Sequence, residues 1–599
     1  MSAPADFLDV LRAHVQDDPE HEAVAFVRSD GKEAVTDALT YRELDIAARS
    51  VAARLDREGV RAGDRILLLH PQGLGFVKAF IGCVYAGAVP VPAPLPGGRR
   101  HHFARATGIV RDAEVALVLT DRANIGEIDA WLAESSDPVR SLAVEDAEDG
   151  GPGGWRAPRP GPSALAFLQY TSGSTSEPKG VMVTHANLLH NLGLIARSMG
   201  FTKETRFGSW LPLYHDMGLI GLFLEPLYLG ASATLMSPTE FLKRPLVWLQ
   251  LIDRRDIHIT SAPNFAYELC VRRLTDEQIA GLDLSRWRWA CNGAEPIDAR
   301  TLASFSERFA PAGFRPEAFL PCYGMAETTL FIAGSDPDLP PATRWVDAGD
   351  LERNVFTPLA AEPAPDGFAG DRPARLLASS GTDWELEILI VDPEDHRVLP
   401  DGRIGEIWIK GGSVALGYWD NEEENERTFR AATADGRTGY LRTGDLGVQA
   451  DGQLYVTGRI KEMLITHGRN LYPHDLERTA RAVHPATAAL TGSVFGVPAD
   501  REEIVVVQEV RAPGADAAFH DALVRSIRTA LSDELGVSVT NVVLIRPGKV
   551  RRTTSGKIQR RLMRELFLRN ELEPLYEHLD PAVRARYRTA SPEPVGAAV

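Results

Sequence analysis

The feature that most constrains the fold of this chain is a regular alternation of amphipathic helical patterns with short apolar strands. Residues 41–58 space their apolar side chains along one face of a helix, residues 65–69 form a short apolar run, and residues 73–86 are helical again. Elements that alternate in this way bury their apolar faces against one another in layers. The sequence therefore predicts α/β layers, and after a loop rich in Gly and Pro it continues with a strand at 164–170.

The second half of the chain changes character twice. Residues 350–377 are rich in Ala, Pro and acidic residues and have little periodicity, so we interpret them as an insertion. The runs that follow indicate a small β-rich subdomain with strands at 385–392, 406–410 and 453–458. After Gly458 the pattern is that of a compact α+β domain, with helices at 473–483 and 517–535 and strands at 493–497, 504–510 and 541–545.

These patterns divide the chain into three predicted parts. The first is a large domain over residues 1–458, which carries the insertion near 350–377. The second is a small C-terminal domain over residues 459–581. Residues 582–599 are rich in Pro and Ala, and we expect them to form a flexible tail.

Charge and composition argue against several partners. The 65 basic and 82 acidic side chains give a formal net charge of −17, so the bulk surface repels nucleic acid, and we expect no nucleic-acid partner. The N-terminus lacks the cationic start and apolar run of a signal peptide, and the most apolar stretch is interrupted by Lys78, so we expect no membrane span. Four cysteines without a C-x-x-C pair fit a cytoplasmic location.

One local run reverses the acidic character of the chain. Between Arg546 and Arg569, nine Lys or Arg residues stand against the single Glu565. A solvated helix face and a docking patch for an acidic protein partner both fit this run. The sequence leaves the two readings open.

The strongest local signal is the segment YTSGSTSEPKGV at 170–181, directly after the predicted strand. The backbone N–H groups of such a loop can bind phosphate oxygens, and Lys179 adds a positive charge. Because Lys179 is followed by Gly180, the segment differs from the G-x-x-x-x-G-K-[ST] pattern of P-loop NTPases. The predicted phosphate-binding positions of the loop are Thr171, Ser172, Gly173, Ser174, Thr175 and Lys179.

The loop resembles the signature of the adenylate-forming superfamily, which includes acyl-CoA synthetases, luciferases and nonribosomal adenylation domains. Four further segments resemble its motifs in the same order: YGMAE at 323–327, YLRTGDL at 440–446, GRIK at 458–461 and RTTSGK at 552–557. The resemblance implies ATP and Mg²⁺ as cofactors. It further implies that Glu327 binds the metal, Asp445 the ribose hydroxyls and Arg459 the ribose or phosphate, that Lys461 is the hinge, and that Lys557 is the catalytic lysine.

Elementary chemistry supports these assignments. A carboxylate that attacks the α-phosphorus of ATP brings two anions together, so a cation must bridge them, and Mg²⁺ must offset the pyrophosphate charge. Lys557 and Glu327 meet these needs, and we assign catalytic roles to Lys557, Lys179, Glu327 and His215. Each of these residues alone would also fit an ordinary turn, surface or core position.

Closer matches narrow the resemblance to fatty acyl-AMP ligases. They are WLPLYHDMGLI at 210–220, APNFAYELC at 262–270, NGAEPI at 292–297 and PCYGMAE at 321–327. This family makes an acyl adenylate from a fatty acid and passes the acyl group to the phosphopantetheine thiol of a holo acyl carrier protein, in polyketide or nonribosomal peptide pathways. Coenzyme A is used poorly, and an extra segment lies where residues 350–377 stand.

The resemblance also supplies the remaining site residues and two departures from the wider superfamily. Ala326 stands where many relatives have Thr, and Ser176 stands where Gly is common; both fit the narrower family. The implied nucleotide-binding residues, besides the loop, are Asn292, Gly293, Ala294, Glu295, Cys322, Tyr323, Gly324, Met325, Asp445 and Arg459. The implied acyl pocket consists of His215, Met217, Phe265 and Tyr267, for which core packing is an equally good reading.

The fold class implied by the resemblance is α/β, with a large N-terminal domain of two layered α/β subdomains plus a small β-barrel-like subdomain, followed by a small mobile α+β domain. Three alternatives stay open: an acyl-CoA synthetase, an amino-acid adenylation domain and a catalytically silent adenylate-binding module. An amino-acid adenylation domain would need an acidic residue to meet the ammonium group of its substrate, and this chain has none at 218–224. A silent module would have no need to keep five residues that this chain has together: Lys179, Glu327, Asp445, Lys461 and Lys557.

Overall fold

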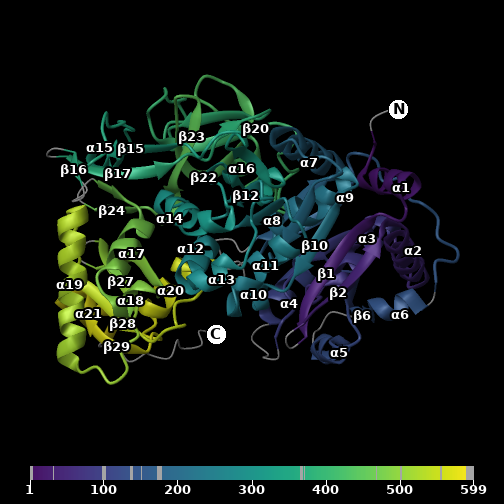
Figure 1. Cartoon of the computed structure of the whole chain (residues 1–599), viewed down its shortest axis with the longest axis horizontal. Coiled ribbons are helices and arrows are strands. Elements are labelled where there is room, and N and C mark those ends of the chain that lie inside the picture. Colours follow the sequence, from purple (N-terminus) through teal and green to yellow (C-terminus); the bar gives the residue numbers. More distant parts are fainter. Residues whose placement is uncertain are drawn as a thin grey trace, which may run out of the picture.

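The structure is a computed structural model, shown in Figure 1, in which two domains of unequal size lie side by side. It describes residues 4–30, 33–97, 103–134, 139–149, 151–171, 178–364, 368–369, 372–466, 469–499, 502–553 and 556–588. The N-terminal elements (purple) lie at one end of the molecule, and the C-terminal helices and strands (yellow) lie at the other.

A nine-stranded mixed sheet is the centre of the large domain. Its strand order is β18-β14-β13-β12-β11-β9-β10-β1-β2, and the pairs from β13 to β1 are all parallel. Because parallel strands end at the same edge, the loops after β9, β11, β12 and β13 share one side, where open α/β sheets bind ligands. The strands are β1 (Glu22–Asp30), β2 (Glu33–Thr40), β9 (Arg206–Ser209), β10 (Ser232–Met236), β11 (Ile259–Ala262), β12 (Trp289–Asn292), β13 (Phe319–Gly324), β14 (Phe331–Gly334) and β18 (Thr382–Asp383).

A second layered unit forms the N-terminal part of the chain. Its parallel sheet has the order β4-β3-β5-β6, with β3 (Arg65–Leu68), β4 (Val89–Pro92), β5 (Leu117–Thr120) and β6 (Arg140–Ala143). The predicted helices are confirmed as α2 (Tyr41–Arg57), which Thr40 and Glu43 cap reciprocally, and α3 (Leu74–Ala86). The two helices approach so closely that a Cβ on Gly82 would lie 2.4 Å from Val51 Cγ1.

The predicted strand at 164–170 is also confirmed. It is β7 (Leu165–Thr171), which pairs antiparallel with β8 (Lys179–Thr184), so these two strands form the base of the phosphate loop. The remaining helices of the large domain are α1 (Phe7–Asp17), α4 (Phe103–Asp112), α5 (Ile125–Glu134), α6 (Val144–Asp149), α7 (His185–Met199), α8 (Asp216–Leu219), α9 (Glu225–Leu229), α10 (Pro238–Lys243), α11 (Leu246–Arg254), α12 (Asn264–Arg273), α13 (Asp276–Ala280), α14 (Ala299–Phe309) and α16 (Glu422–Phe429).

The β-rich subdomain is an antiparallel sheet. Its strands are β19 (Glu387–Val391), β20 (Gly405–Lys410), β21 (Ala431–Ala432), β22 (Thr438–Ala450) and β23 (Gln453–Arg459). The predicted insertion is more regular than its composition indicates. It begins within α15 (Ala348–Leu351) and ends in β17 (Arg372–Ala378), which pairs with β15 (Thr343–Asp347) and with β16 (Phe368–Ala369).

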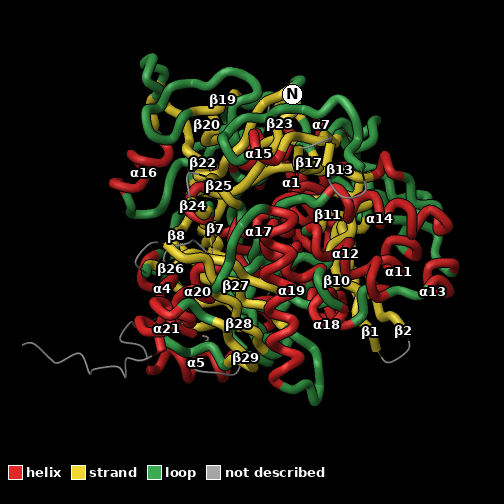
Figure 2. Tube along the Cα trace, turned by 90° about the vertical axis from the view of Figure 1, so that its left-hand side faces the viewer, coloured by secondary structure: helices red, strands yellow, loops and turns green. Residues whose placement is uncertain are grey.

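The C-terminal domain has a four-stranded sheet with helices on both faces. Figure 2 shows its strands between α19 on one side and α20 and α21 on the other. Side chains of α17 and α19 pack on one face and those of α20 and α21 on the other. The elements are α17 (Pro473–Ala482), α18 (Pro485–Ala488), α19 (Ala517–Leu535), α20 (Arg560–Leu568), α21 (Pro581–Arg588), β24 (Leu464–Thr466), β25 (Arg469–Leu471), β26 (Gly492–Pro498), β27 (Glu502–Glu509), β28 (Asn541–Ile545) and β29 (Pro574–His578).

One boundary differs from the prediction. The tail expected from residue 582 onward includes most of α21, because Val583 is fully buried against Phe567 in the core of the C-terminal domain. Residues 589–599 lie outside the described residues. None of the helices in the described part of the chain has the length and apolar character that a bilayer-spanning helix needs.

Candidate active site

A cavity of about 620 Å³ lies between the two domains. The large domain supplies most of its wall, and Lys557 reaches it from the C-terminal domain. The loops after β9, β12 and β13 contribute, as their shared edge of the sheet predicts.

Asp445 is held rigidly beside this cavity, next to Gly444 and Arg459, which line it. It lies on β22 directly opposite Arg459 on β23. Its Oδ1 is 2.7 Å from Arg459 Nε, and its Oδ2 accepts a hydrogen bond of 2.7 Å from the hydroxyl of Tyr323. Burial raises the pKa of Tyr323 well above its usual value, so that hydroxyl remains a donor. The carboxylate is therefore fixed in place with lone pairs left for the two hydroxyls of a ribose.

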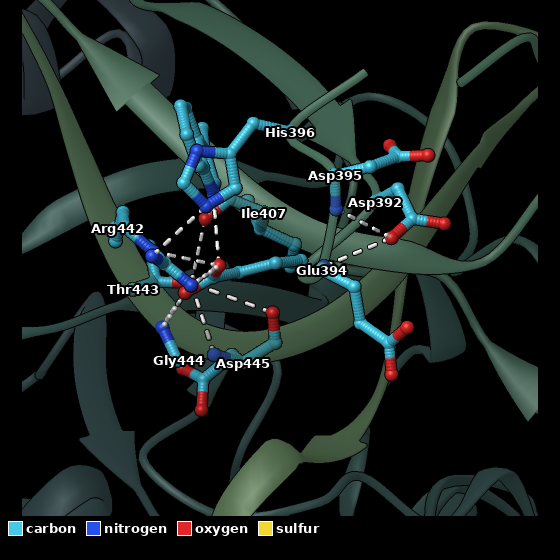
Figure 3. Close-up of polar contacts among 11 residues, drawn as sticks. Asp392, Glu394, Asp395, His396, Ile407, Arg442, Thr443, Gly444 and Asp445 are labelled. Atoms are coloured by element: carbon cyan, nitrogen blue, oxygen red, sulfur yellow. Dashed lines mark hydrogen bonds and ion pairs between the residues drawn. The ribbon is translucent and has the colours of Figure 1, made fainter. Parts of the chain in front are cut away.

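A buried glutamate supports the Asp445 loop from behind. Glu406 is 2% exposed, and its carboxylate accepts hydrogen bonds from Arg442 Nε (3.0 Å), Trp408 Nε1 (2.9 Å) and the backbone N–H of Gly444 (3.0 Å). Figure 3 shows Arg442 reaching toward His396 and the 443–445 backbone curving around this network. The network fixes the turn that immediately precedes Asp445.

Lys557 also lines the cavity. The backbone of Gly556 lies against the ring of Phe265 of the large domain, since a Cβ on Gly556 would be 2.6 Å from Phe265 Cε1. Burial, with the nearby charge of Arg459, lowers the pKa of Lys557, and the carboxylates of Asp216 and Glu295 oppose that shift. The C-terminal domain thus holds an ammonium group inside the cavity of the large domain.

Lys179 and Glu327 are linked through one tyrosine. Lys179 Nζ forms an ion pair of 2.7 Å with Glu424 Oε1 and lies 4.9 Å from the ring centroid of Tyr418. The hydroxyl of Tyr418 donates a 2.8 Å hydrogen bond to Glu327 Oε1. Burial raises the pKa of Glu327, so a nearby cation would favour its charged form.

These residues fit the Mg²⁺ that the sequence predicts. Among the described residues no cluster of three or more His, Cys, Asp or Glu side chains could hold a metal by itself. Mg²⁺ is commonly held by one or two carboxylates together with substrate phosphates, and Glu327 supplies such a carboxylate at the cavity wall. Of the predicted loop residues, Thr171 and Lys179 line the cavity, while Ser172, Gly173, Ser174 and Thr175 lie outside the described residues.

The predicted adenine site is only partly at the cavity. Gly293, Ala294, Cys322, Tyr323, Gly324 and Met325 all line it. Asn292 is instead fully buried and donates to Asn264 Oδ1 (3.2 Å). Glu295 accepts a 2.6 Å hydrogen bond from the backbone of Phe265 and is absent from the wall. Asn292 and Glu295 therefore support the loop rather than face the cavity.

The predicted acyl pocket needs a correction. His215 and Met217 line the cavity, but Phe265 packs against the ring of Trp210, and Tyr267 is fully buried in the aromatic core, where it donates to the Cys291 carbonyl (2.8 Å). The apolar wall is formed by residues that the sequence reasoning missed: Ile195, Met199, Phe201, Ile259, Leu330 and Phe331. Ile195 and Met199 are four positions apart on α7, a spacing that also describes an ordinary core face.

His215 lies where the polar and apolar parts of the cavity meet. Burial, with the charges of Lys557 and Arg105, lowers its pKa to about 3. The imidazole is therefore neutral at physiological pH. It can accept or donate a hydrogen bond beside a carboxylate without adding a charge.

The α/β fold, the aspartate held beside the cavity, the lysine from the C-terminal domain and the apolar wall of the same cavity together fit an enzyme that joins an acid to a nucleotide. The family of AMP-binding enzymes matches residues 11–419. The chain is 38% identical to the medium-chain-fatty-acid–[acyl-carrier-protein] ligase JamA of Moorena producens, over 96% of this chain and 97% of that one. It is 37% identical to the long-chain-fatty-acid–AMP ligase FadD26 of Mycobacterium marinum, over 92% and 95%.

A solved structure agrees with these relatives. The fatty acyl-adenylate ligase of Legionella pneumophila, in complex with acyl adenylate and pyrophosphate, is 35% identical, with a TM-score of 0.73 over 96% of this chain and 98% of that one. The chain therefore belongs to the AMP-binding enzyme family and, within it, to the fatty acyl-AMP ligases.

Proposed function

We propose that this protein uses ATP to convert a fatty acid into acyl-AMP and pyrophosphate, and then transfers the acyl group to the phosphopantetheine thiol of a holo acyl carrier protein. The observation that carries the proposal is the continuity of one cavity. It runs from Gly444, Arg459 and Lys557, beside the buried Asp445, to an apolar wall containing Met199 and Phe331. Such a cavity holds a nucleotide and an aliphatic chain with the carboxylate between them.

In the first half-reaction, a carboxylate oxygen of the fatty acid attacks the α-phosphorus of ATP. The bond between that phosphorus and the bridging oxygen breaks, and its electron pair leaves with pyrophosphate. Lys557 stabilises the charge that builds up between the two anions, while Asp445 and Tyr323 hold the nucleotide by its ribose. Mg²⁺ bound at Glu327 would neutralise phosphate charge.

The second half-reaction needs a different arrangement of the domains. The carrier thiolate attacks the acyl carbonyl and AMP leaves, but Lys557 occupies the cavity wall in the present arrangement. Lys461 lies in the short helix η6 (Ile460–Glu462), between the last strand of the β-rich subdomain and β24. We infer that rotation at Lys461 withdraws Lys557 and opens the route for the thiol.

Contacts of the insertion support a carrier protein, rather than coenzyme A, as acceptor. Glu352 forms a bidentate pair with Arg469 (2.6 and 2.7 Å), and Arg375 forms a buried ion pair of 2.5 Å with Asp475. Both pairs tie the insertion to residues after the hinge. Because these pairs hold the C-terminal domain in its present position, coenzyme A alone would rarely meet the domain in the position that thiol transfer needs. A docked carrier protein contributes binding energy of its own, which can favour that position.

The basic run supports docking only in part. Arg560 is buried in ion pairs with Glu477 and Glu462, so this residue holds the C-terminal domain together and is not a docking residue. Arg561 is half exposed and pairs with Glu565 one turn later. A docking patch for an acidic carrier protein therefore excludes Arg560 and must use the exposed basic residues of the run, such as Arg546 and Arg551.

The cellular compartment in which the reaction takes place is also part of the proposal. All four cysteines lie in the described part of the chain and are free thiols, which suits the reducing cytoplasm that we propose. The polyketide or nonribosomal peptide pathway that the acyl group enters is likewise proposed from the family.

Pyrophosphate exchange over a panel of fatty, aryl and amino acids tests the proposal. We expect exchange with fatty acids. Holo carrier protein and coenzyme A are then offered together, and mass analysis should find the acyl group on the carrier. Exchange with amino acids alone would contradict the assigned substrate class, and exchange with no acid would favour a silent module. Acyl-CoA formed efficiently beside unmodified carrier would identify an acyl-CoA synthetase.

A further inference from the structure

Two cations lie beside the strands at the base of the phosphate loop, but only one of them has an acidic partner. Lys179 is paired with Glu424 at 2.7 Å, so its charge is already offset in this structure. Arg105, on α4, forms no ion pair with any carboxylate in the described part of the chain. Its one hydrogen bond with the described residues is a long contact of 3.4 Å from Nη2 to the Tyr170 carbonyl. A partly buried guanidinium without a counter-ion is costly unless a ligand supplies one.

The position of Arg105 is fixed by the helix that carries it. One turn after Arg105, Gly108 lies against the ring of Pro178, since a Cβ there would be 3.4 Å from Pro178 Cγ. Tyr170 also contacts α4: its hydroxyl donates a hydrogen bond to the carboxylate of Asp112, at the end of that helix. The helix is thus packed against residues at both ends of the phosphate loop, and Arg105 lies one turn before the first of these contacts.

Arg105 also acts on the cavity itself. Its charge contributes to the lowered pKa of His215, which lines the cavity, so the guanidinium lies within electrostatic reach of the reacting centre. Burial lowers the pKa of Arg105, but arginine remains charged at neutral pH because its ordinary pKa is so high. Arg105 does not itself line the cavity, but its Nη2 contacts the carbonyl of Tyr170, which does, so a cation with no acidic partner among the described residues lies directly behind this part of the wall.

We propose that Arg105 binds the β- and γ-phosphates of ATP and the pyrophosphate that departs from them. This inference rests on the proposed adenylation. When the bond to the α-phosphorus breaks, the electron pair moves to pyrophosphate, whose negative charge increases. The planar guanidinium offers several N–H donors in the geometry that phosphate oxygens accept. Lys557 faces the acyl and α-phosphate side, so the two cations divide the charge of the transition state between them.

The test compares Arg105→Gln and Arg105→Lys with Arg111→Gln, a matched control on the exposed face of the same helix. The first readout is the KM for pyrophosphate in the reverse reaction, in which acyl-AMP and pyrophosphate form ATP. We expect Arg105→Gln to raise this KM by about 10- to 100-fold, as for loss of a charged hydrogen bond. Arg105→Lys should recover part of the loss, and Arg111→Gln should leave the KM unchanged.

A second readout separates binding from structure. The affinity for an acyl-sulfamoyl adenosine, which has no β- or γ-phosphate, should be the same in all four proteins. An equal loss for this analogue and for pyrophosphate would show a structural role and overturn the proposal. A raised KM for the fatty acid with unchanged KM for pyrophosphate would also overturn it.

Calorimetric titration of magnesium pyrophosphate into the protein gives the same comparison without turnover. If no acid supports adenylation, the proposed function is wrong, but this titration still shows whether Arg105 contributes to pyrophosphate binding. Wild-type protein that binds no pyrophosphate, or Arg105→Gln that binds it equally well, would contradict the inference.

Discussion

In the mechanism that we propose, the first half-reaction uses an ammonium group that the C-terminal domain places at the cavity of the large domain. Burial and the nearby charge of Arg459 both lower the pKa of Lys557. Three carboxylates oppose this shift and favour the charged form: Asp216, Glu295 and Asp445. A preorganised charge of this kind acts most strongly where water is excluded. This explains why a residue about 380 positions after the phosphate-loop lysine belongs to the same site.

The first prediction concerns that charge. Lys557→Ala should reduce acyl-AMP formation by about 10²- to 10³-fold, the loss typical of removing one preorganised donor. The melting temperature should stay close to that of the wild type, because the side chain packs no core. Pyrophosphate release measured in single turnovers checks the rate. Unchanged adenylate yield would remove Lys557 from the mechanism.

The second prediction concerns the support of Asp445. Glu406→Ala should destabilise the protein by about 3–5 kcal/mol, because Arg442 would be left as a largely buried charge without its partner. Glu406→Gln, which keeps the shape and some acceptors, should cost less stability but still weaken AMP binding. Denaturant titration and AMP affinity measure the two effects. Glu406→Gln that binds AMP as the wild type does would argue that Asp445 needs no such support.

The sequence predicted the polar residues of the site better than the apolar ones. The resemblance to family motifs implied Asp445, Lys557 and Glu327, and the structure places Lys557 and Glu327 at the cavity wall and Asp445 directly beside it. Phe265 and Tyr267 were expected at the acyl pocket, yet Tyr267 packs among core aromatics, and Met199 on α7 forms part of the wall instead. Apolar spacing on a helix does not distinguish a cavity wall from a core, because both require the same side chains.

At the scale of elements, helical and strand patterns were predicted well where periodicity was strong. The strand expected at 541–545 coincides with β28, and the helix expected at 517–535 coincides with α19. The structure of the insertion was harder to predict, because β17 is stabilised by its pairing with β15 and has no periodic sequence pattern of its own. Sheet pairing between distant segments is a tertiary effect that local composition does not reveal.

The third prediction concerns the hinge element. Lys461→Pro, in η6, should spare acyl-AMP formation and reduce thiol transfer by at least about 10-fold, because proline fixes φ where rotation is needed. Lys461→Ala is the matched control and should retain transfer. Separate assays of pyrophosphate exchange and carrier loading measure the two steps. Equal losses in both steps would show that no reorientation takes place at this residue.

At the scale of the whole molecule, the two domains are held in one arrangement by charged pairs that the insertion makes. Arg375 reaches across to Asp475, and Glu352 to Arg469, so the insertion touches the chain on the far side of the hinge. The cavity and these pairs form parts of one closed state. The rotation that we propose at Lys461 would have to break both pairs.

The fourth prediction follows from that closed state. The double change Glu352→Gln and Arg375→Met should raise any acyl-CoA by-product by about 5- to 30-fold, as expected if ~1–2 kcal/mol of closure is lost. Arg353→Met, at an exposed pair within the insertion, is the matched control. Acyl-CoA is quantified by mass spectrometry with the carrier protein omitted. No increase in the double variant would separate the insertion from acceptor choice.

The central claim is that one cavity makes an acyl adenylate whose acyl group is destined for a carrier protein. The most direct measurement is mass analysis after the wild-type protein, ATP, Mg²⁺ and a fatty acid react with holo carrier protein and coenzyme A in equal amounts. We predict that the carrier gains the mass of the acyl group and that coenzyme A stays essentially free. Acyl-CoA as the main product, with holo carrier unmodified, would contradict the account.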